Sequence, residues 1–192
     1  MKRLLLAALV SCLLPLPTSV AATEYNQVQA DKSTVSFVSK QMGVPSDGRF
    51  GKFSARIAFD PAKPELARAQ IEVDLASINA GSAEANDEVK GKTWFNVREF
   101  PTATFIASHL RSLGGGRFEA AGKMTIKGMT RDIVAPFTAK ASGDVIVLEG
   151  GIPIQRLQFG IGEGIWSDTA TVADEVQVRF SFTLSAVPAA KK

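Results

Sequence analysis

Most of the chain alternates apolar and polar residues with a period of two. The alternation is clear over residues 53–60, 69–75, 118–126 and 176–184, and weaker over 34–40, 102–110, 131–140, 144–149 and 152–159. Because successive side chains of a strand point to opposite faces, this pattern predicts strands with one apolar and one polar face. Short turns rich in Gly, Pro and Asp separate these segments and favour antiparallel neighbours. The alternation therefore predicts an all-β fold.

One segment has the pattern of a helix. Ser82 can cap a helix over residues 83–92, with Glu84 in the first turn and Glu88 four residues before Lys92. An irregular aromatic stretch, residues 93–101, follows it. A single helix beside an antiparallel sheet fits either a lid over an opening or a crossover packed on one side. The sequence leaves both interpretations open.

Eight or nine amphipathic strands can form a closed barrel or a two-sheet sandwich. Two features favour the barrel. Several strands run for about ten residues, or roughly 30 Å, and their apolar faces mix Phe with Ala and Gly. We therefore predict an extended eight-stranded antiparallel barrel with room inside for one small ligand. The alternative is that the small residues fit the taper of a barrel filled by its own side chains.

The candidate ligand-binding residues are those expected to line this cavity. They are apolar residues of the predicted strands and aromatic residues of the connections, which could equally plug the barrel ends as ordinary core. The set comprises Phe37, Phe53, Ile71, Trp94, Phe105, Ala120, Met124, Ile126, Ala135, Phe137, Phe159, Trp166 and Phe180.

The first 22 residues have the pattern of a secretory signal peptide. Lys2 and Arg3 precede an apolar run, and small residues end at Ala22. The run is too short and too interrupted by proline to span a membrane. This predicts a signal peptide over residues 1–22 and one mature domain over 23–192. A second interpretation is a lipoprotein cleavage box ending at Cys12, which would then carry the lipid.

Composition excludes several classes of function. The chain has 22 Lys and Arg residues and 19 Asp and Glu residues. Two of the basic residues, Lys2 and Arg3, belong to the predicted signal peptide, so the net charge of the mature chain is near zero and nucleic acid is not an expected partner. Cys12 is the single cysteine, so the mature chain has no disulfide and no thiol chemistry. His109 is the single histidine, which excludes a two-histidine zinc site. We predict neither a catalytic residue nor a metal site.

Two weaker signals remain. His109 has the same strand parity as Phe105 and Ala107, so it could lie at the end of the cavity as a polar handle or a general base. The alternative, which is the more usual role of a single strand histidine, is a partly buried structural residue. Residues 160–164, Gly-Ile-Gly-Glu-Gly, look superficially like a phosphate-binding loop, but the full glycine spacing and a following helix are missing.

Five segments together resemble the YceI-like family of bacterial envelope proteins. They are residues 31–37, 48–50, 94–105, 122–130, and 157–162 with 174–176. Their order and spacing cover nearly the whole mature chain. The sequence departs from the family pattern at Lys32, where many relatives have His, at Met124, where Leu is usual, and at Gln158, where Asp or Asn is common. These departures bear on polar head-group contacts more than on the fold.

The resemblance implies an extended, lipocalin-like barrel that holds a polyisoprenoid or another long amphiphile, generally in the periplasm. Some relatives accompany membrane cytochromes and quinones. We therefore expect a non-enzymatic periplasmic carrier of a polyisoprenoid or isoprenoid quinone. No cofactor other than such a lipid is expected, and a membrane cytochrome or quinone-handling protein is the expected partner. The alternatives are an enzyme on a lipophilic substrate with His109 as base, and an envelope stress protein with an incidental cavity.

Overall fold

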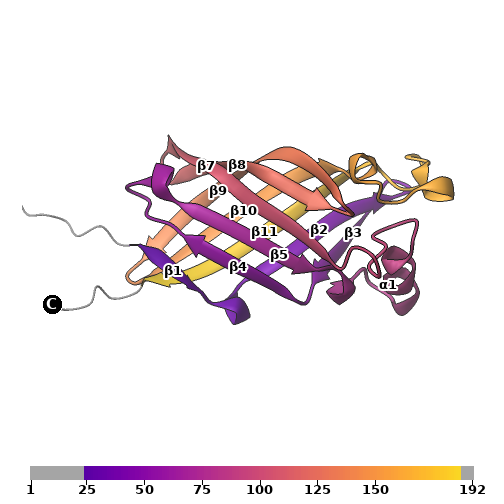
Figure 1. The fold of residues 1–192 in the computed structure, drawn as a ribbon, viewed down its shortest axis with the longest axis horizontal. Coiled ribbons are helices and arrows are strands. Elements are labelled where there is room, and N and C mark those ends of the chain that lie inside the picture. The colour runs from indigo at the N-terminus through magenta and orange to yellow at the C-terminus, as the bar shows by residue number, and fades with distance from the viewer. Residues whose placement is uncertain (1–23, 187–192) are drawn as a thin grey trace, which may run out of the picture.

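The computed structural model describes residues 24–186, which form a curled antiparallel sheet with one α-helix (Figure 1). The strands are β1 (Tyr25–Val28), β2 (Thr34–Gln41), β3 (Val44–Phe50), β4 (Phe53–Ala58), β5 (Arg68–Asp74), β6 (Ile78–Asn79), β7 (Thr102–Gly114), β8 (Arg117–Ile126), β9 (Met129–Ser142), β10 (Val145–Gln155) and β11 (Glu175–Ala186). The helix is α1 (Ala83–Lys90), and the 3₁₀ turns are η1 (Ala30–Lys32), η2 (Pro64–Leu66), η3 (Leu75–Ser77), η4 (Arg156–Phe159) and η5 (Gly164–Ser167). The all-β prediction is confirmed. The predicted signal peptide and Cys12 lie outside the described residues.

The sheet contains eleven strands rather than the predicted eight. Its order is β4-β5-β7-β8-β9-β10-β11-β2-β3-β6, with β1 also paired to β11. The difference arises because three long strands are bent. β1 and β2 pair with the same edge of β11 on either side of η1, β3 continues into β4 after two residues, and β5 continues into β6 through η3. If each of these three pairs of segments is counted as one bent strand, the barrel has eight strands.

The sheet closes on itself at the β1 end. Tyr25 and Phe59 exchange backbone hydrogen bonds, with N to O distances of 2.9 and 3.0 Å, and so join β1 to the residue after β4. A single sheet therefore surrounds one interior, which excludes the two-sheet sandwich. The lipocalin-like barrel is the observed architecture.

The helix follows the sequence prediction closely. The Ser82 hydroxyl accepts a hydrogen bond from the backbone N–H of Ala85 at 3.1 Å, so it is the N-cap. The helix ends at Lys90, two residues before the predicted end, and Gly91 is its C-cap.

One predicted turn is wrong. Gly150 and Gly151 were expected to separate two strands, but residues 145–155 form the single strand β10. A Cβ atom on Gly150 would overlap the carbonyl oxygen of Pro136 and the Phe180 ring. Glycine is required here by the close approach of neighbouring groups within the sheet, not by a turn.

The end of the barrel nearest β1 is closed by aromatic packing. The Phe59 ring lies 5.1 Å from the Phe118 ring and 5.9 Å from the Phe137 ring, and all three residues are buried. α1 lies at the opposite end (Figure 1). Apolar side chains therefore close one end, while helix and loops cover the other.

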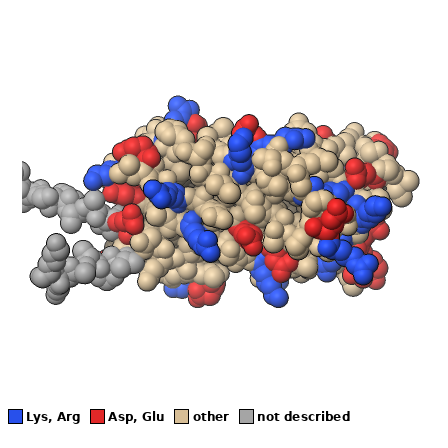
Figure 2. Space-filling view, in the orientation of Figure 1, with Lys and Arg blue, Asp and Glu red and all other residues tan. Residues whose placement is uncertain are grey.

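Most charged residues lie on the outside of the barrel. Lys and Arg side chains are intermixed with Asp and Glu over the face shown in Figure 2, so that face carries no extended patch of one sign. Within residues 24–186, no helix is long and apolar enough to cross a membrane.

We expect Phe59→Ala to destabilise the barrel by about 3–5 kcal/mol, the usual range for truncating a buried aromatic residue. Phe59 is 0% exposed and lies next to the seam between β1 and β4. Urea denaturation followed by circular dichroism measures the loss. The control is Ile106→Ala, because Ile106 is 52% exposed and should cost less than about 1 kcal/mol. Equal losses for the two variants would contradict this assignment of the seam.

Candidate functional site

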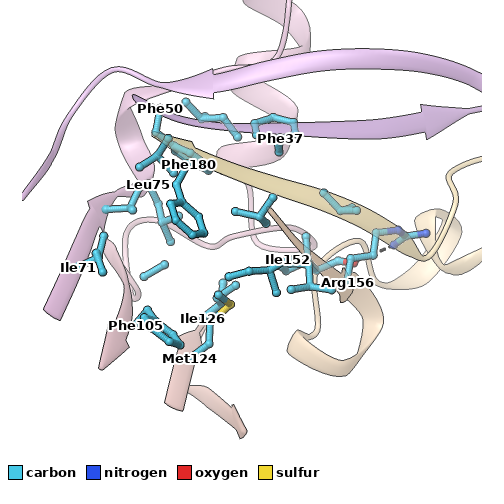
Figure 3. Close-up of a pocket in the computed structure, with 18 of the residues that line it drawn as sticks. Phe37, Phe50, Ile71, Leu75, Phe105, Met124, Ile126, Ile152, Arg156 and Phe180 are labelled. Carbon is cyan, nitrogen blue, oxygen red and sulfur yellow. Dashed lines mark hydrogen bonds between the residues drawn. The ribbon is translucent and has the colours of Figure 1, made fainter. Parts of the chain in front are cut away.

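The barrel encloses an apolar cavity of about 600 Å³ (Figure 3). It extends from α1 to the aromatic cluster around Phe59. Its volume is in the range typical of small-molecule sites. The small residues Ala120 and Ala135 line this space, so the barrel is not filled end to end by its own side chains.

Eleven of the thirteen residues predicted to line the cavity are located on its wall. They come from strands around the barrel and from the two loops at its α1 end: Phe37, Ile71, Trp94, Phe105, Ala120, Met124, Ile126, Ala135, Phe137, Trp166 and Phe180. The period-two pattern was sufficient to place the strand residues among them, because it identifies the inner face of each strand.

Phe53 and Phe159 do not line the cavity. The Phe53 ring packs edge-on against Phe182 at 5.9 Å, and Phe182 forms the cavity wall at that point. Phe159 belongs to η4 rather than to a strand, and it is buried beneath the Arg131 guanidinium, 5.9 Å from the ring centre.

Neither interpretation of His109, at the cavity end or as a partly buried structural residue, matches the structure. Ala107 pairs with Gly122 and His109 pairs with Ala121, so Ser108 is an additional residue in β7. Such a bulge reverses the alternation beyond it. His109 is consequently exposed, and the next residue, Leu110, is buried on the cavity wall.

The helix covers the cavity opening. Glu84, Glu88 and Val89 of α1 line the cavity, so α1 is not a crossover packed on the outside of the barrel. The indole Nε1 of Trp166 donates a hydrogen bond of 2.7 Å to the Glu88 carboxylate. The Trp166 ring also lies 5.6 Å from the Trp94 ring. These contacts join the helix to η5 across the opening.

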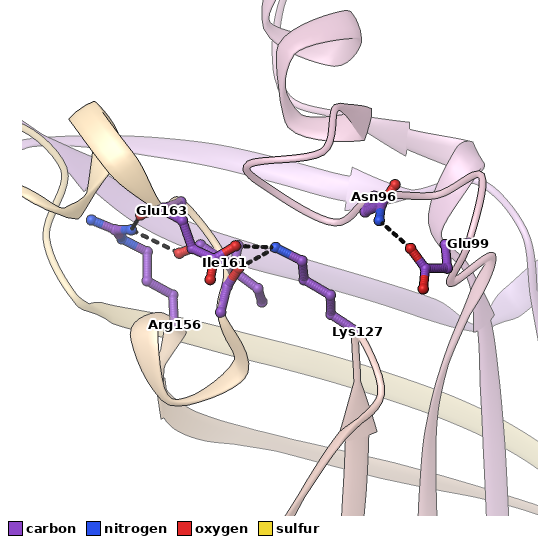
Figure 4. Close-up of polar contacts among 8 residues, drawn as sticks. Asn96, Glu99, Lys127, Arg156, Ile161 and Glu163 are labelled. Atoms are coloured by element: carbon purple, nitrogen blue, oxygen red, sulfur yellow. Dashed lines mark hydrogen bonds and ion pairs between the residues drawn. The ribbon is translucent and has the colours of Figure 1, made fainter.

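Arg156 organises the loops at this end, and sequence reasoning missed it. Its side chain is 1% exposed and lines the cavity, with the guanidinium directed toward the loops (Figures 3 and 4). All of its hydrogen bonds go to backbone carbonyl oxygens. The acceptors are Ala173 at 3.0 Å from Nε, Ile161 and Gly162 at 2.8 and 3.0 Å from Nη1, and Trp166 and Val172 at 2.6 and 2.7 Å from Nη2.

The glycine-rich loop at residues 160–164 contacts this guanidinium on one side. Gly162 has a φ of +79°, and a Cβ atom there would overlap Nη1 of Arg156. The Arg156 guanidinium also lies over the Trp94 ring, 5.6 Å from its centre. Burial lowers the pKa of Arg156, and the Asp174 carboxylate opposes this shift. Arginine stays charged in proteins, so the loop accommodates a cation of the protein itself.

An ion pair fixes the neighbouring turn. Lys127, between β8 and β9, donates to the carbonyl oxygen of Gly160 at 2.6 Å and to the Glu163 carboxylate at 2.8 Å (Figure 4). The turn after β8 is thereby attached to the loop around Arg156. In the part of the chain that the structure describes, no group of three or more His, Cys, Asp and Glu side chains could hold a metal ion.

Comparison with known sequences identifies the family. The YceI-like domain matches residues 26–184. The chain belongs to the YceI-like family. Among its relatives, a UPF0312 protein of Azotobacter vinelandii is 29% identical over 167 residues, which cover 83% of this chain and 87% of the relative.

Solved structures show the same YceI-like fold. Burkholderia cenocepacia BcnA is 44% identical, with a TM-score of 0.80 over 82% of this chain and 99% of BcnA. The YceI protein of Campylobacter jejuni is 21% identical, with a TM-score of 0.67 over 74% of this chain and 85% of that protein. A polyisoprenoid binding domain of Saccharophagus degradans is 16% identical, with a TM-score of 0.64 over 86% of this chain and 99% of that domain. The last two similarities concern the fold alone.

We expect Arg156→Lys to destabilise the protein by at least about 2 kcal/mol. A lysine has three donors on one nitrogen and cannot bond all five carbonyl groups, and each buried acceptor without a partner costs about 1–3 kcal/mol. Urea denaturation measures the loss, and near-ultraviolet circular dichroism should show a change at the Trp94–Trp166 pair.

Arg179→Lys is the matched control for this experiment. Arg179 is exposed and pairs loosely with Asp47 at 3.9 Å, so its replacement should change stability by less than about 0.5 kcal/mol. An Arg156→Lys variant as stable as this control would show that the carbonyl contacts do not hold the loop.

Proposed function

We propose that this protein is a periplasmic carrier that binds one long amphiphilic lipid, a polyisoprenoid or isoprenoid quinone, in the barrel cavity. The observation that carries the proposal is the apolar cavity of about 600 Å³, covered by α1 at one end and closed by phenylalanines at the other. An apolar chain would lie inside, with its head group at the α1 end. The eleven predicted residues on the cavity wall are its proposed contacts.

The energetics suit reversible loading. Each buried methylene contributes about 0.8 kcal/mol, so ten carbons contribute roughly 8 kcal/mol before the costs of ordering, nominally near micromolar affinity. The usual alternative environment of such a lipid is a bilayer rather than water. The net preference for the cavity should therefore be small, as a carrier that loads and releases its ligand requires.

Two further observations support this assignment. The similar fold from Saccharophagus degradans is named a polyisoprenoid binding domain. The predicted signal peptide at residues 1–22 supports the periplasmic location. We propose binding rather than turnover because His109, on which the enzymatic alternative depended, is exposed and absent from the cavity wall. A membrane cytochrome or quinone-handling partner stays a prediction from the family resemblance.

Glycines opposite cavity-facing phenylalanines keep the lumen wide. Gly48 of β3 pairs with Phe37 of β2, and Gly150 of β10 pairs with Phe180 of β11. A Cβ atom on either glycine would overlap the ring opposite. Each ring therefore lies against the wall over a glycine instead of projecting across the cavity. At Gly48, the three nearest atoms to such a Cβ all belong to the Phe37 ring, so the ring can move aside.

We expect purified protein to contain about one long-chain lipid per chain, and Ala120→Phe or Ala135→Phe to remove it while the fold persists. Ala120 and Ala135 are paired across β8 and β9, and both line the cavity. Organic extraction and mass spectrometry measure the lipid, and circular dichroism checks the fold. Val134→Phe is the control, because Val134 precedes Ala135 but is 53% exposed. Unchanged lipid in both folded cavity variants would contradict the proposal.

We also expect Gly48→Ala to lower the lipid content by displacing the Phe37 ring into the lumen, with little loss of stability. The same extraction measures the lipid, normalised to protein. Gly51→Ala serves as control, because a Cβ atom there would meet its nearest neighbour, the Ser77 carbonyl oxygen, at an ordinary 3.5 Å. If both variants retain the full lipid content, the Phe37–Gly48 contact does not set the width of the cavity.

A further inference from the structure

The charged residues on the cavity wall are one arginine and two glutamates. They are Arg156, Glu84 and Glu88, and no lysine or other arginine of residues 24–186 lines the cavity. A phosphate or diphosphate head group would need a cation with free donors at this end of the barrel. Arg156 is therefore the first residue to consider as its partner.

Arg156 has no donor left for a ligand. A guanidinium carries five N–H donors, and the structure shows five hydrogen bonds from Arg156 to backbone carbonyl oxygens. Binding a phosphate would break these bonds and leave carbonyl groups of the loop without a partner. The Arg156 guanidinium therefore stabilises the protein's own loops rather than a ligand.

The two carboxylates lie where the head group would be. Glu84 and Glu88 are exposed residues of α1, and both line the cavity. Hydrogen bonds from its own backbone N–H and from the Ser82 hydroxyl lower the pKa of Glu84, so this carboxylate is ionised at neutral pH. Two negative charges at the opening repel a phosphorylated head group and have little effect on an uncharged one.

Uncharged polar side chains also line the α1 end of the cavity. Ser39 of β2 and Ser46 of β3 are paired in register, Gln41 lies two residues beyond Ser39, and all three line the cavity. Their side chains take part in none of the hydrogen bonds that the described residues make with one another. Hydroxyl and amide groups both donate and accept, so they can bind a carbonyl or hydroxyl group.

We propose that the α1 end of the cavity selects lipids with an uncharged head group, such as an alcohol or a quinone, and disfavours phosphate and diphosphate esters of the same chain. Glu84 and Glu88 supply the discrimination by repulsion, while Ser39, Gln41 and Ser46 bind the neutral head. This inference rests on the proposed function, since it specifies which lipids the cavity accepts.

The test compares farnesol, farnesyl phosphate and farnesyl diphosphate, which share one apolar chain. Trp94 and Trp166 are the two tryptophans of the chain and both line the cavity, so quenching of their fluorescence in delipidated protein measures each Kd. We expect farnesol to bind at least about tenfold more tightly than the diphosphate at low ionic strength, with the monophosphate between them. Added salt should reduce the difference in Kd between farnesol and its phosphate esters, because it screens exposed charges.

A double variant, Glu84→Gln with Glu88→Gln, isolates the carboxylates. It should tighten binding of the diphosphate by about tenfold and change the Kd of farnesol much less, so that the ratio of the two Kd values falls. The amide oxygen that replaces the Glu88 carboxylate can still accept the hydrogen bond from Trp166, so the cover over the cavity is preserved. Glu65→Gln, in η2 shortly after the seam at Phe59, is the matched control and should change neither value.

Three outcomes would contradict parts of this account in different ways. A diphosphate that binds as tightly as farnesol would overturn the proposed selection while leaving lipid binding intact. If the double variant shows the same difference in Kd between farnesol and the diphosphate, the two carboxylates do not cause that difference. Protein that binds none of the three compounds would contradict the proposed function itself.

Discussion

The apolar inner face of the barrel must exclude water from the lumen without filling it with side chains, and the rest of the structure depends on this constraint. A hollow interior forfeits part of the dispersion energy that a close-packed core provides. The structure compensates at its ends. At the β1 end Phe59 packs edge-on against two other phenylalanine rings, and at the α1 end the Arg156 guanidinium bonds five loop carbonyls. The packing at the two ends of the barrel therefore stabilises the structure around the cavity.

The use of Arg156 as a structural group has chemical consequences for the cavity. A buried guanidinium would ordinarily indicate a site for an anion. Here its donors stabilise the loops after β10, and the other charged side chains on the cavity wall are the carboxylates of Glu84 and Glu88. The Arg156 guanidinium therefore has no N–H donor available for a ligand. Structural stability and head-group preference follow from the same set of hydrogen bonds.

Sequence reasoning failed where one residue changes the geometry of its neighbours. The additional residue at Ser108 reverses the parity of β7, so His109 points outward although its number places it on the inner face. Gly150 and Gly151 have the composition of a turn, but the close approach of Phe180 and Pro136 explains the glycine at 150 within one continuous strand. Neither case is visible in a local pattern, because both depend on residues from adjacent strands.

The sequence by itself determined the antiparallel strands with one apolar face, the capped helix at residues 83–90, and most of the apolar wall, because alternation and N-capping act between residues close in the chain. Tertiary structure alone decided where the sheet closes, at Tyr25 and Phe59, how three bent strands become six segments, and which carbonyl groups accept the hydrogen bonds of Arg156. Those features arise where residues far apart in the chain meet. Their outcome depends on side-chain packing and carbonyl positions that only the closed barrel brings together.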